Sequence, residues 1–269
     1  MSQLKIQNLL VATATDHVLV DDLSFELLHG GRLGLLGESG SGKSLTALAI
    51  MGLLGEDLKV RGSIKFEEQE LLGENEEDLC AMRGSGVGII FQDSLASLDP
   101  VMKIGRQLRR VLKKYQGIRG DLLGAGILNA LAEVKISNPK RTANSYPHQI
   151  SGGERQRVAI SLALACQPKI LIADEITTSL DVIVQSEILT LLDSIIRQRG
   201  MSLIFITHDL AVAVQIIEEV IILREGKIIE SGRVEDVLAF PKSRYVTDLI
   251  LSARSLDHLL DRIKFGDLK

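Results

Sequence analysis

A glycine-rich stretch, "GESGSGKS" at residues 37–44, constrains this chain more than any other part of its sequence. It fits the pattern G-x-x-x-x-G-K-[ST] at every position, and it lies between a short apolar strand pattern and an apolar helical pattern. Such a loop lets backbone N–H groups converge on the phosphates of a nucleoside triphosphate, while the lysine reaches the β- and γ-phosphates and the last serine offers a hydroxyl to Mg²⁺. The sequence therefore predicts a site for ATP and Mg²⁺. The predicted nucleotide-binding residues of the loop are Gly37, Glu38, Ser39, Gly40, Ser41, Gly42, Lys43 and Ser44.

Polar residues follow three other apolar strand patterns. Asp174 and Glu175 end "ILIADE", Gln92 follows "GVGIIF", and His208 follows "SLIFIT". Polar groups at the carboxyl ends of strands in a doubly wound sheet face the ligand crevice. Because phosphoryl transfer depends mostly on positioning and charge stabilisation, we expect Asp174 to organise the Mg²⁺ shell and Glu175 to orient and polarise the attacking water.

The order of these patterns predicts an α/β fold of the P-loop NTPase (RecA-like) type. After residue 158, helical and strand patterns alternate, which is typical of a mostly parallel sheet covered by helices. We expect one domain over residues 1–269, with an antiparallel β subdomain in its first part. Its predicted parts are a nucleotide-binding core at 1–92 and 158–239, a helical subdomain at 93–157, and a short C-terminal extension at 240–269.

Composition excludes several other classes of protein. The formal charge is −4, so no nucleic-acid partner is expected. The two cysteines, Cys80 and Cys166, fit neither a disulfide framework nor a metal site, as expected for a reducing cytosol. No signal peptide and no membrane-spanning run is predicted. The histidines are scattered and predict no metal site, and the acidic stretch "GENEEDL" at 73–79 is interpreted as a solvated loop.

A second glycine-rich turn lies in "YPHQISGGERQR", residues 146–157, and runs directly into a helical pattern. The phosphate loop, this turn and the acidic pair together resemble the ATP-binding cassette (ABC) ATPases. "SGGERQR" resembles the signature motif of that family, and "SLD" at 179–181 resembles its D-loop. By the same resemblance Gln92 matches the Q-loop and His208 the switch histidine.

The resemblance explains why one chain has two helix N-termini built for phosphate. In that family two nucleotide-binding domains pack head to tail, and each ATP lies between the phosphate loop of one and the signature serine and glycines of the other. It implies that Ser151, Gly152, Gly153 and Asp181 serve the nucleotide of a sister subunit. The implied catalytic residues are Glu175, His208 and Gln92, and the implied Mg²⁺ ligands are Ser44, Gln92 and Asp174.

Longer segments narrow the resemblance to the dipeptide/oligopeptide/nickel importer ATPases. These segments are "FQDSLASLDPVMKIG", "IADEITTSLDVIVQSEIL", "ITHDLAVAVQI" and "FPKSRYVTDLILSA". The resemblance implies a translocase at the cytoplasmic side of the cell membrane. Its implied partners are a second, homologous ATPase in a heterodimer, two membrane permeases and an extracellular substrate-binding protein. The insert after Gln92 would receive the permeases.

Three departures from the family pattern bear on mechanism and substrate. Ile176 replaces the proline that usually follows the acidic pair, but no reacting group is lost. The aromatic residue that commonly stacks on adenine is missing, so adenine is expected to rest on Val18 or Val20. The C-terminal region lacks the cysteine cluster of many peptide importers, which favours nickel or a metallophore as cargo, with di- or oligopeptides as the alternative.

Three rival classes explain less of the sequence. An ABC ATPase acting on nucleic acid or ribosomes would carry long heptad coiled coils or two cassettes, and neither is present. A nucleotide kinase or GTPase leaves "SGGERQR" unexplained. A regulatory module that binds ATP without hydrolysis is suggested only by Ile176.

Overall fold

The computed structural model describes residues 2–93, 97–178 and 180–253. They divide into two compact units, one from Met1–Asn75 with Ser202–Lys269 and the other from Glu76–Met201. Parts of three predicted features lie outside the described residues: 94–96 of the helical subdomain, Ser179 of "SLD" and 254–269 of the C-terminal extension.

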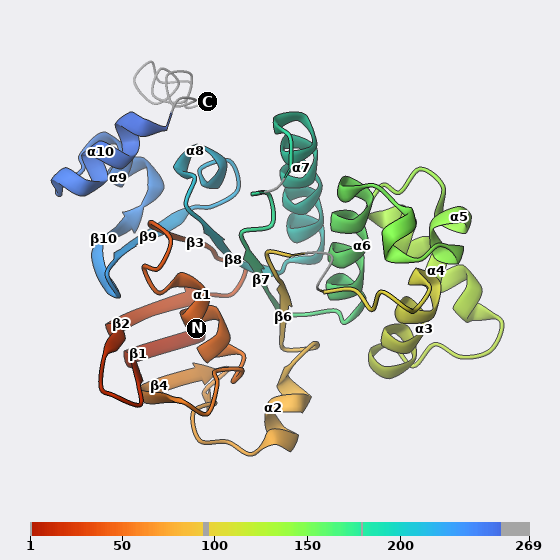
Figure 1. The fold of residues 1–269 in the computed structure, drawn as a ribbon, viewed down its shortest axis with the longest axis horizontal. Helices are drawn as coiled ribbons and strands as arrows, with labels where there is room; N and C mark the ends of the chain where they lie inside the picture. The colour runs from red at the N-terminus through yellow and green to blue at the C-terminus, as the bar shows by residue number, and fades with distance from the viewer. Residues whose placement is uncertain (1, 94–96, 179, 254–269) are drawn as a thin grey trace. The chain divides into compact units, whose positions relative to one another are not determined.

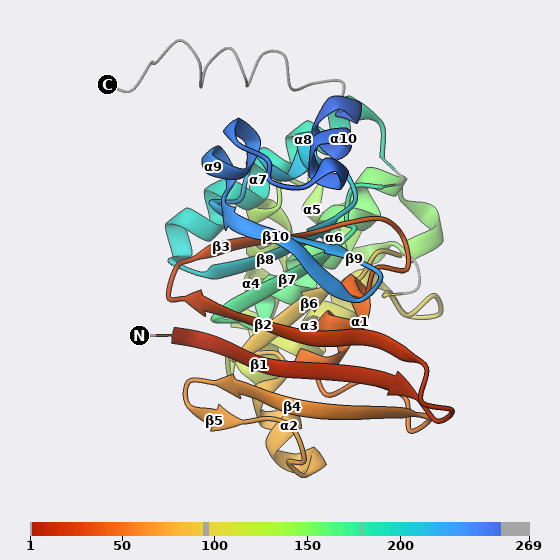
Figure 2. The same ribbon diagram turned by 90° about the vertical axis from the view of Figure 1, so that its left-hand side faces the viewer.

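The first unit contains an antiparallel sheet in the order β2-β1-β4-β5, as Figure 2 shows. Alternate residues of its strands are apolar and buried, and Ile6 of β1 pairs with Ile64 of β4 at the centre. Side chains alternate between the faces of a strand, so one face can pack on a core. This sheet is the predicted antiparallel β subdomain. The strands are β1 (Ser2–Thr13), β2 (Val18–Leu28), β4 (Leu58–Phe66) and β5 (Gln69–Glu70).

The first unit also contains four strands in the order β10-β9-β3-β8. β3 lies parallel to both β8 and β9, whereas β9 and β10 form an antiparallel hairpin. β3 and β8 are buried along their whole length, as expected for central parallel strands. The strands are β3 (Arg32–Leu36), β8 (Ser202–Thr207), β9 (Glu219–Arg224) and β10 (Lys227–Arg233). The helices are α1 (Lys43–Ile50), α8 (Leu210–Ala213), α9 (Val234–Ala239) and α10 (Arg244–Ser252).

The second unit combines two parallel strands with helices. β6 pairs in parallel with β7, and α3, α4, α5 and α6 form a separate group of helices at the right of Figure 1. An ion pair at 2.6 Å between the largely buried Arg157 and the exposed Glu187 joins α6 to α7. The strands are β6 (Val87–Ile90) and β7 (Ile170–Asp174). The helices are α2 (Glu76–Met82), α3 (Ile104–Tyr115), α4 (Leu122–Glu133), α5 (Pro139–Asn144), the 3₁₀ turn η1 (Pro147–Gln149), α6 (Gly152–Ala165) and α7 (Val182–Arg199).

Two local predictions need correction. Part of the acidic stretch interpreted as a loop is the first half of α2, whose Leu79 and Met82 are buried. Acidic residues in a first helical turn are stabilised by the helix dipole, so a charged stretch can begin a helix. In "DLAVAVQII" the helical pattern extends over nine residues, but α8 itself has only four.

Candidate active site

The phosphate loop connects β3 to α1 in the first unit, as predicted. Gly37 has a φ of 149°, and a Cβ at this position would lie 2.1 Å from the carbonyl oxygen of Leu223 on β9. Gly42 precedes α1 with a φ of 100°, and a Cβ there would lie 3.0 Å from Cγ2 of Val20. Both positions require glycine, because a side chain would be strained and would collide with the strands beneath the loop.

The lysine of the loop is buried and held by the loop itself. Lys43 is 4% exposed, and its ammonium donates to the carbonyl oxygens of Gly37 and Glu38, both at 2.8 Å. A third, longer contact reaches the hydroxyl of Ser41 at 3.4 Å. The charge therefore lies inside the concave face of the loop, where the phosphates of a nucleotide would have to be held.

The N-terminus of α1 is open to an anion. No side chain caps it, and no acidic residue lies in its first turn. Glu38, Ser39, Gly40 and Ser44 are exposed, and a Cβ added at Gly40 would meet no atom within 4 Å. N–H groups at a helix N-terminus attract phosphate, and this loop adds a cation to them. The loop therefore fits a nucleoside triphosphate, which would supply the phosphoryl group for transfer.

The switch histidine follows β8 at the same end of the sheet as the loop. Thr207, the last residue of β8, pairs with Leu36, the last residue of β3. His208 comes next and is exposed. Asp209 fixes the turn, since its carboxylate accepts from the N–H of Ala211 at 2.9 Å. The first unit thus presents the loop and His208 at one edge.

The two valines predicted to support adenine differ in exposure. Val18 is 42% exposed, whereas Val20 is 1% exposed and packs beneath Gly42. Only Val18 is exposed enough to contact the adenine ring, so the structure does not support Val20 in that role. The sequence pattern could not separate them, since both lie on the same strand two residues apart.

In the second unit, strand register brings Gln92 and Glu175 together. Ile90 of β6 pairs with Ala173 of β7, so the residues two positions further on meet at the same edge. The amide of Gln92 donates to a carboxylate oxygen of Glu175 at 3.1 Å. These two residues were predicted from separate motifs, and their hydrogen bond makes them one polar cluster.

Thr178 is a member of this cluster that sequence reasoning missed. Its hydroxyl lies 2.9 Å from the carbonyl oxygen of Glu175 and 3.3 Å from the same carboxylate oxygen that Gln92 reaches. Glu175 has a φ of 46°, a conformation that costs a non-glycine residue of the order of 1–3 kcal/mol. Ile176 is 2% exposed and anchors the turn in the core, while Asp174 just before it is buried. Apolar packing at Ile176 thus replaces the constraint that proline would supply.

The signature turn forms a capped helix N-terminus. Ser151 is the N-cap of α6, and its hydroxyl accepts from the N–H of Glu154 at 3.2 Å. The carboxylate of Glu154 accepts in return from the N–H of Ser151 at 3.2 Å. This reciprocal pair is a capping box. Glu154 therefore helps to begin the helix.

The signature turn lies beside the start of α7. A Cβ added at Gly153 would lie 3.2 Å from Cγ1 of Val184, so the glycine allows the two helix starts to approach closely. Asp181, the aspartate of the D-loop motif, caps α7 by accepting from the N–H of Val184 at 3.0 Å. Val182 and Ile183 next to it are 81% and 74% exposed. Two predicted partner-facing motifs therefore share one surface of the second unit, and that surface has exposed apolar side chains.

A groove of about 610 Å³ adjoins Gln92 in the second unit. Phe91 and Asp93, the neighbours of Gln92, line it together with Ser97 and residues of α6. A segment bound in this groove would contact Phe91 and Asp93, the residues on either side of Gln92 in the chain. Gln92 itself is hydrogen-bonded to Glu175.

Comparison with known proteins defines the class. The family model described as "ABC transporter" matches residues 20–178, more than half of the chain. The chain therefore belongs to the ABC transporter family, and it is an ATPase in which ATP hydrolysis is coupled to transport.

Its relatives within that family include oligopeptide transport ATP-binding proteins named OppD. The chain is 43% identical over 257 residues to the oligopeptide transport ATP-binding protein OppD of Haemophilus influenzae, covering 94% of this chain and 80% of that protein. OppD of Salmonella typhimurium is 41% identical, with 94% and 77% covered. The chain thus falls in the OppD branch of the importer ATPases.

Solved structures confirm the predicted fold. The chain matches cbiO1 from Clostridium perfringens, part of the ABC transporter complex cbiONQ, with a TM-score of 0.78 at 25% identity, covering 97% and 99% of the two chains. The dimeric cassette MJ0796 bound to ADP and Pi matches with a TM-score of 0.75 at 26% identity, covering 86% and 98%. The α/β prediction with an antiparallel β part and an inserted helical part is that of an ABC ATPase.

Two further findings concern membranes and metals. Among the described residues, no helix is both long enough and apolar enough to cross a bilayer. In the same part of the chain, no group of three or more His, Cys, Asp or Glu residues could hold a metal ion.

Proposed function

We propose that the chain is the ATP-hydrolysing subunit of an importer for di- or oligopeptides. The substrate rests on relatives that are named oligopeptide transport ATP-binding proteins, at about two-fifths identity over most of the chain. The sequence favoured nickel because a C-terminal cysteine cluster is missing, but no relative compared supports a nickel cargo. The peptide alternative is therefore preferred.

The observation that carries the mechanism is the exposed signature turn at Ser151. It has the form of a phosphate site, but its own helix start is already capped by the reciprocal pair of Ser151 and Glu154. We infer that it faces the nucleotide of a second ATPase, which would in turn face the phosphate loop of this chain. The exposed apolar pair Val182 and Ile183 beside it supports such an interface, since exposed apolar groups often mark one. The second ATPase is proposed to be a homologue, giving a heterodimer.

Each polar residue then has a role in hydrolysis. Glu175 accepts a proton from the attacking water, and Gln92 holds its carboxylate in place. His208 contacts the γ-phosphate held by the loop of its own unit. Ser44, Gln92 and Asp174 carry the hydroxyl, amide and carboxylate oxygens that suit Mg²⁺, which would neutralise charge on the phosphates.

The remaining partners follow from the groove beside Gln92. We propose that it receives a cytoplasmic segment of one of the two membrane permeases, so that permease movement is transmitted to Glu175 through Gln92. This places the chain at the cytoplasmic face of the cell membrane without spanning it. A substrate-binding protein on the outer side would deliver the peptide.

Uptake by a strain that lacks the gene tests the substrate. We expect lost uptake of labelled di- and oligopeptides and unchanged uptake of nickel, cobalt and zinc. Complementation with Glu175→Gln should fail, and complementation with the wild-type gene should restore uptake. A selective metal deficit with normal peptide uptake would overturn the peptide proposal while leaving the ATPase intact.

A further inference from the structure

The formal charge of −4 conceals a strong separation of charge along the chain. Residues 103–141 contain ten lysines and arginines but only two acidic residues, Asp121 and Glu133. This stretch covers α3, α4 and the first half of α5 in the second unit. The helical subdomain is therefore strongly basic within an acidic protein.

The basic charge is concentrated on α3. Its apolar face, with Ile104, Leu108 and Leu112, is buried. At 100° per residue, the cations of the helix fall within an arc of about 140° on the opposite face. Among the described residues, no ion pair engages any of them. The basic face of α3 consists of Arg106, Arg109, Arg110, Lys113 and Lys114, all of them exposed.

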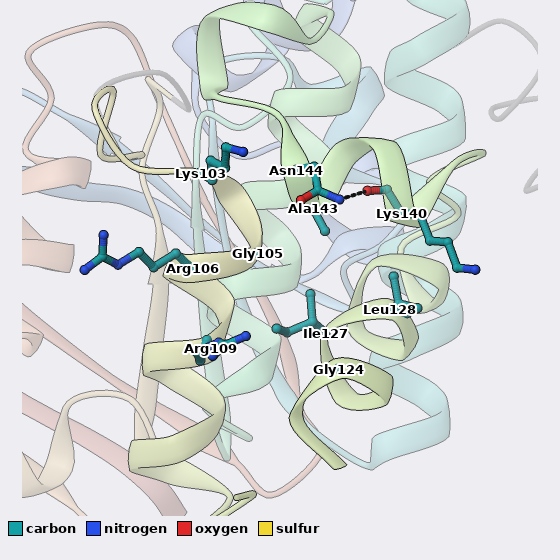
Figure 3. A pocket seen from close by; sticks show the side chains of 10 residues that line it. All are labelled: Lys103, Gly105, Arg106, Arg109, Gly124, Ile127, Leu128, Lys140, Ala143 and Asn144. Carbon is teal, nitrogen blue, oxygen red and sulfur yellow. Dashed lines mark hydrogen bonds between the residues drawn. The ribbon is translucent and has the colours of Figure 1, made fainter. Parts of the chain in front are cut away.

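A cavity of about 490 Å³ opens between α3, α4 and α5 at the edge of this face. Figure 3 shows Arg109 directed toward Ile127 of α4, whereas Arg106 extends to the other side of α3. Lys103 lies near Asn144, and Lys140 lies on the opposite wall. Cations thus surround a cavity with an apolar wall, and no acidic residue lines it.

We propose that the basic face of α3 and this cavity bind the anionic headgroups of phospholipids at the cytoplasmic surface of the membrane. The inference rests on the proposed place of the chain beneath membrane permeases. Anionic lipids attract each exposed Lys or Arg near the surface by about 1 kcal/mol. A row of exposed cations that form no ion pair among the described residues suits a plane of phosphates, and the cavity can take one phosphoglycerol group.

Two other anionic partners fit less well. Single-stranded nucleic acid is usually held by several aromatic side chains that stack on its bases. Tyr115 is the single aromatic residue of α3, and the ammonium group of Lys114 already lies over its ring at 4.9 Å. A surface that binds one acidic protein segment specifically usually combines cations with hydrogen-bonding side chains. Repeated cations over three helical turns carry little such selectivity.

Vesicle flotation with the purified chain tests the proposal. Wild-type protein should float with vesicles of phosphatidylcholine and phosphatidylglycerol but not with phosphatidylcholine alone, and added salt should release it. The variant R106Q/R109Q/R110Q/K113Q should bind the anionic vesicles at least about tenfold more weakly, given the contribution of each cation. Glutamine is a good helix former, so α3 should persist.

A matched control removes four other exposed cations, from the first unit. R61Q/R233Q/K242Q/R244Q has the same net charge as the α3 variant and should bind anionic vesicles like wild type. Circular dichroism and binding of a fluorescent ATP analogue check that both variants are folded. Equal loss in the two variants, or no binding by wild type, would overturn the proposal.

Competition separates the other sources of negative charge. Inorganic phosphate, a duplex RNA and a polyglutamate peptide should each displace the protein from anionic vesicles only at high concentration. Tighter binding to the RNA or the peptide than to the vesicles would reject the lipid proposal in favour of that partner. Vesicle binding needs no ATP hydrolysis or transport, so this result is independent of the substrate test.

Discussion

The N-termini of α1 and α6 are both built for phosphate, but they are prepared for it differently. At α1 no side chain caps the helix, and a buried ammonium group, that of Lys43, is held by the carbonyl groups of the loop. At α6 the capping box of Ser151 and Glu154 satisfies the helix start with a carboxylate. The first can hold a triphosphate by its own groups. The second is complete without one, which fits the proposal that its phosphate comes with a partner.

Loss of the carboxylate at Glu175 should have the largest effect. Glu175→Gln keeps the hydrogen-bonding shape toward Gln92 and Thr178 but cannot take a proton, so phosphate release should fall at least about hundredfold. ATP binding should persist. Phosphate release by the purified complex is the measurement, with Thr178→Val as a control that should lose only a few-fold. If the Glu175→Gln variant released phosphate at the wild-type rate, Glu175 would not be the group that accepts the proton from water.

Two glycines of the phosphate loop should respond unequally to alanine. Gly37→Ala puts a Cβ within 2.1 Å of a strand carbonyl, so ATP affinity should fall more than about tenfold and stability by roughly 1–3 kcal/mol. Gly40→Ala enters open space and should cost only about 1 kcal/mol of stability for its positive φ. Titration with a fluorescent ATP analogue and thermal melts compare them. Equal losses would contradict the loop geometry.

The capping box at α6 predicts that a substitution there improves the use of ATP slightly, in contrast to the losses predicted for Glu175 and Gly37. Glu154→Gln keeps a capping side chain but removes a negative charge where a partner's nucleotide would approach. The KM for ATP of the assembled ATPase should fall about two- to fivefold, because a charge at a helix end is worth roughly 0.3–1 kcal/mol. Steady-state kinetics at low salt measure it. An unchanged KM with unchanged stability would mean that no phosphate approaches this turn.

The two cysteines of the second unit should differ in their rate of alkylation, and alkylation of Cys80 should leave ATPase activity unchanged. Burial raises the pKa of the Cys166 thiol from its ordinary value of 9.0 to about 11, opposed in part by Lys114, whereas Cys80 is exposed. The folded state therefore favours the neutral thiol, and the stability this gives is present below pH 9 and lost as pH rises toward 11. At mildly alkaline pH, iodoacetamide should label Cys80 first, as mass spectrometry can show. Faster labelling of Cys166 would contradict its burial.

Local signals in the sequence predicted the fold and most of the site. The phosphate loop between a strand and a helix, the helix after the second glycine-rich turn, and the strands before Gln92 and Glu175 all lie where their patterns place them. Each depends on neighbours within a few residues, such as a cap, a glycine with positive φ or an apolar period.

Features that depend on tertiary contacts could not be predicted. Whether Val18 or Val20 faces outward, and whether Thr178 reaches the Glu175 carboxylate, follow from packing between strands and turns. The helix α2 could not be recognised from its charged first turn. Its buried residues are only Leu79 and Met82, which are too few to give a clear helical pattern. Net charge gave no sign of the basic face of α3, since the acidic residues elsewhere outweigh it.

Photolabelling tests most directly whether a neighbour's nucleotide reaches the turn at Ser151. An ATP analogue with a photoreactive group on its γ-phosphate would be bound to the intact transporter, and labelled peptides would be identified by mass spectrometry. The account predicts label around Ser151 as well as around Lys43, with the label at Ser151 lost when the ATPases are separated. Label confined to the Lys43 loop in the intact transporter would contradict it.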